Sequence, residues 1–233
     1  MGGGWGALDT RVHGELTQQL DQLAQTNIDR EDLLDPDQVP IRNKGKKWLM
    51  PDCDNCTERC CVHDDPTSGI LLSLRDVANL VDSGLGHLIV GGYTFRKSKK
   101  GRILDEVDAM PRLAKQPDGN CHFYDPGSGR CQGYGTRPTI CRRFPYEVDY
   151  RKKNGKPFTR FIGWSQCPTV EGDEFKPSIE QMARDAVVDE NVSYEDAVLL
   201  GEHVEALRAA GFGKFLPPPE ECPPPAEAVS AEG

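Results

Sequence analysis

The chain has 233 residues, of which 37% are hydrophobic, and a formal net charge of −9 at pH 7. This length allows one domain of ordinary size with extensions. The first ten residues hold neither a basic residue nor an apolar run, and no segment approaches the roughly 20 apolar residues of a membrane-spanning helix, so we expect no signal peptide, no membrane contact and a cytoplasmic protein with reduced thiols.

The net charge is unevenly divided along the chain. Residues 42–160 carry 22 Lys+Arg and 14 Asp+Glu, a balance of +8, whereas the remainder carries 6 and 23, a balance of −17. The basic residues could compensate a negatively charged metal–thiolate centre, bind an anionic partner or form solvated loops. Nucleic acid is the less favoured partner, because few aromatic side chains for base stacking lie among them. The basic stretches are 42–47, 96–102, 142–143 and 151–153.

The N-terminal segment, residues 1–40, is predicted to hold one amphipathic helix over 8–24 and an acidic linker. The apolar residues of this helix recur every three or four positions, which is typical of a helix that packs along one face. They are Leu8, Val12, Leu16, Leu20 and Leu23.

Residues 41–175 form the predicted cysteine domain. We expect a short strand over 69–73, then a helix over 74–81 that begins at a Ser73–Asp76 cap. Residues 102–164 are predicted to form β-hairpins, because turn sequences interrupt them regularly. Asn154-Gly155 is typical of a two-residue turn joining strands at 146–150 and 158–161.

The C-terminal part is predicted to be helical and then unstructured. Two helices are expected within 176–214, the second starting at Ser193 with Asp196 as its capping partner and ending at Gly211. Residues 215–233 are rich in Pro and Glu and are predicted to be a disordered tail. Together these elements indicate an α+β protein: a small irregular cysteine-rich core with β-hairpins, flanked by an N-terminal helix and a C-terminal helical pair.

The cysteines are the most informative residues of the chain. Their spacing suits soft metals, which indicates an iron–sulfur cluster, iron or zinc and argues against magnesium and calcium. A disulfide framework is the alternative, but it requires an oxidising compartment. Cys222, in the predicted tail, is not expected to be a ligand. The other eight are Cys53, Cys56, Cys60, Cys61, Cys121, Cys131, Cys141 and Cys167.

The adjacent pair Cys60-Cys61 bears on the number of metal ions. Neighbouring side chains of an extended backbone point to opposite sides, so the pair suits two centres or two irons of a polynuclear cluster better than one tetrahedral ion. Cys121 and Cys131 flank a predicted turn, which would bring them close enough to share a metal. His63 and His122 could complete an open site, although surface positions are the simpler interpretation.

Four segments carry a resemblance to a known family: Cys53-x2-Cys56-x3-Cys60-Cys61, Gly119-x-Cys121-x-Phe123-Tyr124-Asp125, Gly129-x-Cys131 and Tyr134-x2-Arg137-Pro138-x2-Cys141-Arg142. They are similar to segments of the YkgJ-like cysteine-cluster proteins, which are described as candidate zinc or iron chelators. The resemblance implies a metal centre on the seven matched cysteines, with Cys167 as the eighth ligand.

Three further residues are candidates for contact with the bound group. Arg137 and Arg142 would lie near the thiolates, where they could compensate charge or bind an anionic substrate, and Pro138 would fix a short turn carrying Cys141. Tyr134 could shield the cluster or donate to its sulfurs, with core packing as the alternative.

These observations predict an iron-containing cysteine cluster that serves redox chemistry or iron-dependent modification of a protein or peptide. Two alternatives remain open. One is a zinc-stabilised module that binds protein or nucleic acid without catalysis, and the other is metal storage or delivery. The sequence identifies no catalytic residue and no substrate.

Overall fold

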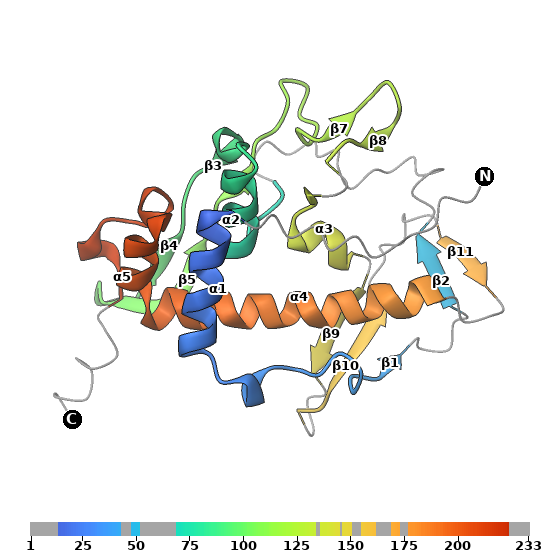
Figure 1. Ribbon diagram of the computed structural model, residues 1–233, viewed down its shortest axis with the longest axis horizontal. Helices are drawn as coiled ribbons and strands as arrows, with labels where there is room; N and C mark the ends of the chain where they lie inside the picture. The colour runs from blue at the N-terminus through green and yellow to red at the C-terminus, as the bar shows by residue number, and fades with distance from the viewer. Residues whose placement is uncertain are drawn as a thin grey trace. The chain divides into compact units, whose positions relative to one another are not determined.

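The computed structural model describes residues 14–42, 48–51, 69–133, 136–144, 146–150, 155–161, 169–172 and 177–223 (Figure 1). By its contacts the chain divides into two units. Unit 1 comprises Met1–Thr10, Leu34–Ser68 and Lys115–Asn191, and unit 2 comprises Arg11–Leu33, Gly69–Ala114 and Val192–Gly233. The described elements are helices and small, mostly antiparallel strand pairs, with helices near both termini, which confirms the predicted α+β class. The predicted division of the chain into the four consecutive segments 1–40, 41–175, 176–214 and 215–233 stays a prediction.

The described elements of unit 1 are β1 Ile41–Arg42, β2 Trp48–Pro51, β7 Tyr124–Asp125, β8 Arg130–Cys131, α3 Thr139–Arg143, β9 Tyr146–Tyr150, β10 Pro157–Phe161, β11 Thr169–Gly172 and the first part of α4, Pro177–Glu202. The hairpin β9–β10 is extended by β1, which runs parallel to β10. Tyr146 of β9 is fully buried against Ala183 and Ala186 of α4, and this burial raises the pKa of its hydroxyl to about 12. The core of unit 1 therefore lies between this sheet and α4.

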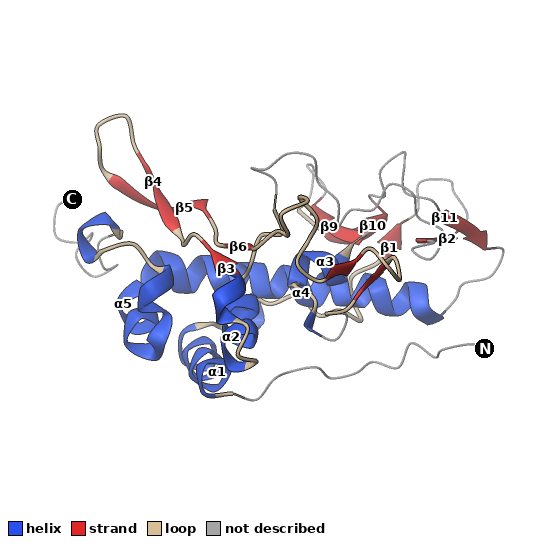
Figure 2. Ribbon diagram, turned by 90° about the horizontal axis from the view of Figure 1, so that it is seen from above, coloured by secondary structure: helices blue, strands red, loops and turns tan. Residues whose placement is uncertain are grey.

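The described elements of unit 2 are α1 Glu15–Asn27, η1 Arg30–Asp32, α2 Leu74–Asp82, η3 Gly86–Leu88, β3 Ile89–Val90, β4 Thr94–Lys97, β5 Ile103–Ala109, β6 Arg112–Leu113, the end of α4, α5 Val204–Leu207, η5 Arg208–Phe212, η6 Gly213–Phe215 and η7 Pro219–Glu221. Strands β3 and β6 pair antiparallel, as do β4 and β5 (Figure 2). Leu72, Leu74, Val77, Leu199 and Leu207 are buried in the core. None of the described helices is both long and apolar enough to span a bilayer.

Helix capping explains how α1 and α2 are fixed. Asp82 at the end of α2 accepts hydrogen bonds from the amides of Leu16 (3.1 Å) and Thr17 (2.9 Å) and from the Thr17 hydroxyl (2.6 Å). The first amides of a helix have no partner inside it, so this carboxylate ties the N-terminus of α1 to α2. The predicted capping box of α2 is confirmed: the Ser73 hydroxyl accepts from the Asp76 amide, and the Asp76 carboxylate accepts from the Ser73 amide, both at 3.0 Å.

The other local predictions are confirmed in part. The predicted N-terminal helix is present from Glu15 and runs three residues beyond residue 24, to Asn27, while residues 8–13 lie outside the described part of the chain. The predicted strand over 69–73 is reduced to a single bridge between Leu71 and Arg112. Its partner strand β6 is only two residues long, which limits the pairing to that bridge.

The hairpin predicted over 146–161 is present, but its register is shifted. A two-residue turn at Asn154-Gly155 would pair Tyr150 with Thr159. Instead, Tyr150 pairs with Pro157, two residues away from the expected partner. A shift of two residues leaves every side chain on its predicted face, because strand side chains alternate with a period of two. Residues 151–154 lie outside the described residues.

The C-terminal predictions need two corrections. Helix α4 passes through Ser193 without a break, and the chain leaves the helix at His203 instead. The carboxylate of Asp196, expected to complete a cap with Ser193, accepts a hydrogen bond from the Leu74 amide at 2.7 Å. The predicted end at Gly211 is confirmed, since this residue has a φ of 101°, which glycine adopts without a steric penalty.

The predicted tail begins later than composition indicated. Phe215, Leu216 and Cys222 are buried, and the Phe215 carbonyl accepts a hydrogen bond from the Tyr93 amide at 2.7 Å. Apolar residues among the prolines are therefore buried within unit 2 as far as residue 223. Composition alone did not predict this, because it does not show which distant surface these residues contact. Residues 224–233 lie outside the described part.

Candidate metal centre

The β7–β8 hairpin positions two of the predicted ligands. Cys131 in β8 pairs with Tyr124 in β7, and the Tyr124 amide donates to the carbonyl of Cys121 at 2.9 Å. The backbones of Cys121 and Cys131 therefore both adjoin Tyr124. Both cysteine side chains are half-buried. The predicted juxtaposition of these residues around one turn is confirmed at the level of the backbone.

Side-chain hydrogen bonds hold this hairpin in shape. Asp125 accepts from the Gly127 amide (2.9 Å), the Ser128 hydroxyl (2.7 Å) and the Gln132 amide nitrogen (3.2 Å). The bond from Ser128 is the main reason why the pKa of Asp125 lies below its ordinary value, followed by the bond from Gly127. Gln116 donates to the carbonyl oxygens of Cys121 (3.0 Å) and Tyr124 (2.6 Å). These hydrogen bonds hold the backbone next to Cys121 without involving its sulfur.

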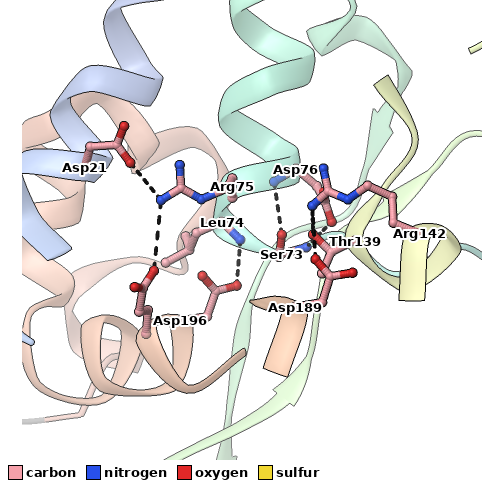
Figure 3. Close-up of polar contacts among 10 residues, drawn as sticks. Asp21, Ser73, Leu74, Arg75, Asp76, Thr139, Arg142, Asp189 and Asp196 are labelled. Carbon is pink, nitrogen blue, oxygen red and sulfur yellow. Dashed lines mark hydrogen bonds and ion pairs between the residues drawn. The ribbon is translucent and has the colours of Figure 1, made fainter. Parts of the chain in front are cut away.

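A short helix positions a third predicted ligand. Pro138 precedes α3, and its carbonyl accepts from the amides of Cys141 (2.9 Å) and Arg142 (3.1 Å), so the predicted proline turn is confirmed. Figure 3 shows Arg142 directed at Asp189 of α4. Its guanidinium lies 3.3 Å from the Asp189 carboxylate, whose side chain is 3% exposed, and 3.1 Å from the Thr139 hydroxyl. This ion pair anchors the helix that carries Cys141.

Two acidic residues of α4, Asp189 and Glu190, interact with the basic residues of α3. Burial raises the pKa of Glu190 above its ordinary value, the charge of Arg143 opposes this rise, and the charge of Glu147 adds to it. Asp189 and Glu190 are therefore two adjacent acids facing basic residues of α3. Sequence reasoning missed both, since 47 positions separate Arg142 from Asp189 and no local spacing connects them.

The strand pair β2–β11 brings together two distant parts of the chain. Pro51, the last residue of β2, pairs with Thr169, the first residue of β11. Cys53 follows this pair by two residues, and Cys167 precedes it by two residues. The segment that begins with Cys53 and the segment that ends with Cys167 are therefore attached to the same end of this strand pair. This pairing could not be predicted from the sequence, because about 120 residues separate the two strands.

Seven of the predicted site residues lie outside the described part of the chain: Cys53, Cys56, Cys60, Cys61, His63, Tyr134 and Cys167. Among the described residues, no group of three His, Cys, Asp or Glu side chains forms a metal site. Cys121, Cys131 and Cys141 supply soft sulfur donors, and Arg142 and Arg143 follow Cys141 in α3. This donor chemistry fits iron or zinc and does not fit calcium or magnesium.

Comparison with known families supports metal binding. Residues 52–161 match the family model CxxCxxCC, whose description is "Putative zinc- or iron-chelating domain". This match confirms the cysteine-cluster family indicated by the motifs, and it contains seven of the eight predicted ligands. Neither the curated proteins nor the solved structures gave a significant match.

The Asp189–Arg142 ion pair gives a first testable prediction. We expect Asp189→Asn to lower metal affinity about tenfold, because residues that orient ligands commonly contribute tenfold to a hundredfold. Competition with a coloured chelator measures this affinity. Asp185→Asn, one turn earlier on α4, is the matched control, since its carboxylate accepts a hydrogen bond from Gln181 of the same helix. Equal metal affinity in Asp189→Asn and wild-type protein would show that α3 needs no such anchor.

Proposed function

We propose that the chain, matched over residues 52–161 by the CxxCxxCC family, binds iron through its cysteine thiolates as an iron–sulfur or non-haem iron centre. The centre would serve redox chemistry or iron-dependent modification of a protein or peptide. The observation that supports this proposal is that three of the cysteines lie on ordered elements, Cys121 and Cys131 at one hairpin and Cys141 on a helix held by the Arg142–Asp189 ion pair. A reducing compartment such as the cytoplasm would keep these thiols available.

Iron is favoured over zinc for two physical reasons. Eight thiolates are twice the number that one tetrahedral zinc ion takes. The adjacent pair Cys60-Cys61 suits separate metal atoms, as in a polynuclear cluster. Iron also changes its oxidation state, whereas zinc does not, so only iron gives such a centre redox chemistry.

Arg137, Arg142 and Tyr134 belong to the same proposal. Arg142 is next to Cys141 in sequence and Arg137 precedes Pro138, so both could balance the negative charge of a metal–thiolate centre. Either arginine could also contact an anionic substrate. Tyr134 would donate to a sulfur of the centre.

The composition of the anaerobically purified protein tests this proposal. We expect iron together with acid-labile sulfide, and a visible absorption band that bleaches in air, because exposed iron–sulfur clusters are oxidised. Iron without sulfide would point to a non-haem iron site. Stoichiometric zinc in a colourless, air-stable protein that unfolds with chelators would overturn the proposal in favour of a structural binding module. Readily exchanged metal of either kind would favour storage or delivery.

A further inference from the structure

The hairpin formed by β4 and β5 ends in a well-defined loop (Figure 2). Lys97 pairs with Ile103, and the loop of 98–102 is closed by three hydrogen bonds. The Ser98 amide donates to the Arg102 carbonyl (2.8 Å), the Gly101 amide donates to the Ser98 carbonyl (2.9 Å), and the Arg102 amide donates to the Ser98 hydroxyl (3.1 Å). Gly101 has a φ of 80°, which completes the turn. Lys99 and Lys100 therefore occupy the two central positions of a closed turn.

The charges of this hairpin are only partly balanced. Arg96 lies 2.7 Å from Glu106, and Lys97 lies 3.4 Å from Glu221. The side chains of Lys99, Lys100 and Arg102 are exposed and form no ion pair within the described residues. Three cations thus stand within four residues on a preorganised loop. Water and salt screen part of their mutual repulsion, and a bound anion would offset the rest.

We propose that this basic tip, defined as Lys99, Lys100 and Arg102, is a docking site for an acidic segment of a partner protein. The hairpin already receives one carboxylate from a distant segment of the chain, because Glu221 lies on the C-terminal 3-10 helix η7 and pairs with Lys97. An acidic partner segment would extend this interaction across the rest of the tip. The loop needs no rearrangement for this, which lowers the entropy cost of binding.

Three observations favour an acidic protein over nucleic acid. Specific nucleic-acid binding commonly neutralises six to ten phosphates, roughly two to three times the number of cations at this tip. The one aromatic residue within the hairpin strands, Phe95, is buried and cannot stack on a base. The chain as a whole carries a net charge of −9, which repels a long polyanion more strongly than a short acidic segment.

Fluorescence anisotropy with two labelled probes tests this docking site. The probes are an octapeptide of glutamate and a duplex DNA of about 20 base pairs. We expect the peptide to bind the full-length protein at low salt and Lys99→Gln/Lys100→Gln/Arg102→Gln to weaken this binding about tenfold, as the loss of three exposed ion pairs implies. Binding should also weaken between about 50 and 200 mM salt, because exposed charges are screened.

A charge-conserving variant provides the control. Lys99→Arg/Lys100→Arg/Arg102→Lys keeps the three cations and should bind the peptide as wild-type protein does. All three side chains are exposed, and the closing hydrogen bonds of the loop are made by the backbone and Ser98, so both triple variants should keep the wild-type melting temperature. No peptide binding, or equal binding by the neutralised variant, would overturn the proposal. Tighter binding of the DNA, lost in the neutralised variant, would assign the tip to nucleic acid instead.

Discussion

Cys121→Ser/Cys131→Ser is expected to purify with less than about a tenth of the wild-type metal content, because a serine hydroxyl is a far poorer ligand for a soft metal than a thiolate. Both residues adjoin Tyr124 in the β7–β8 hairpin, so their removal takes two donors from one place. Metal analysis and the visible spectrum of the anaerobically purified protein provide the measurement. The hairpin itself should persist, since Asp125 and Gln116 hold it by hydrogen bonds that do not involve sulfur.

Cys222→Ser is the matched control for this experiment. Cys222 lies outside residues 52–161, is buried, and contacts Arg208 at 3.5 Å and the Pro217 carbonyl at 3.6 Å. Burial raises the pKa of its thiol, and Arg208 opposes this rise, so it is a poor source of thiolate. Its replacement should leave the metal content unchanged. Full metal content in Cys121→Ser/Cys131→Ser would show that the hairpin cysteines are not ligands.

Asp196→Ala is expected to destabilise the protein by about 1–3 kcal/mol, because it leaves the buried Leu74 amide without its acceptor. Asp196 on α4 accepts from this amide at 2.7 Å, and Figure 3 shows the two groups facing each other. The amide is the first of α2, so the loss also removes a cap from the start of that helix. Urea unfolding measures the effect. Glu202→Ala, an exposed change on the same helix, should change stability by less than about 0.5 kcal/mol.

Asp196→Asn is expected to change how the free energy of unfolding depends on pH. Burial is the largest cause that raises the pKa of Asp196 well above its ordinary value; the Leu74 amide and Arg75 oppose the rise, and Asp76 and Glu195 add to it. The folded state therefore keeps a proton that the unfolded state releases near pH 4.

The consequence is that wild-type stability falls as the pH rises from about 4 towards the folded pKa. An asparagine at position 196 has no such proton and can still accept from the Leu74 amide. We therefore expect the stability of Asp196→Asn, relative to wild type, to rise across the same pH range. Burial also raises the pKa of Glu195, but this group is present in both proteins. Parallel pH profiles of the two proteins would contradict the assignment of a buried, protonated Asp196.

Several features could be predicted from the sequence because both partners lie within a few residues. The Ser73–Asp76 capping box joins positions three apart, and Pro138 starts the turn that carries Cys141. The β9–β10 hairpin was also predicted, but with a register two residues off. Both registers place the same side chains on the same face of the sheet, so the pattern of apolar residues alone could not distinguish them.

The sequence by itself determined the positions of the thiols, the resemblance of residues 52–161 to the CxxCxxCC family, the Ser73–Asp76 cap, the Pro138 turn and the α+β class. Only the tertiary structure decided that α4 continues through Ser193 and that Asp196 caps a helix 122 positions away. It also decided that β2 pairs with β11 and that residues 215–223 pack on unit 2. The physical reason is that a short-range pattern specifies a hydrogen bond only when its acceptor is a near neighbour. The partners of a buried carboxylate, a strand edge or an apolar residue among prolines can lie far away in the sequence. Only the fold determines which distant segment contacts them.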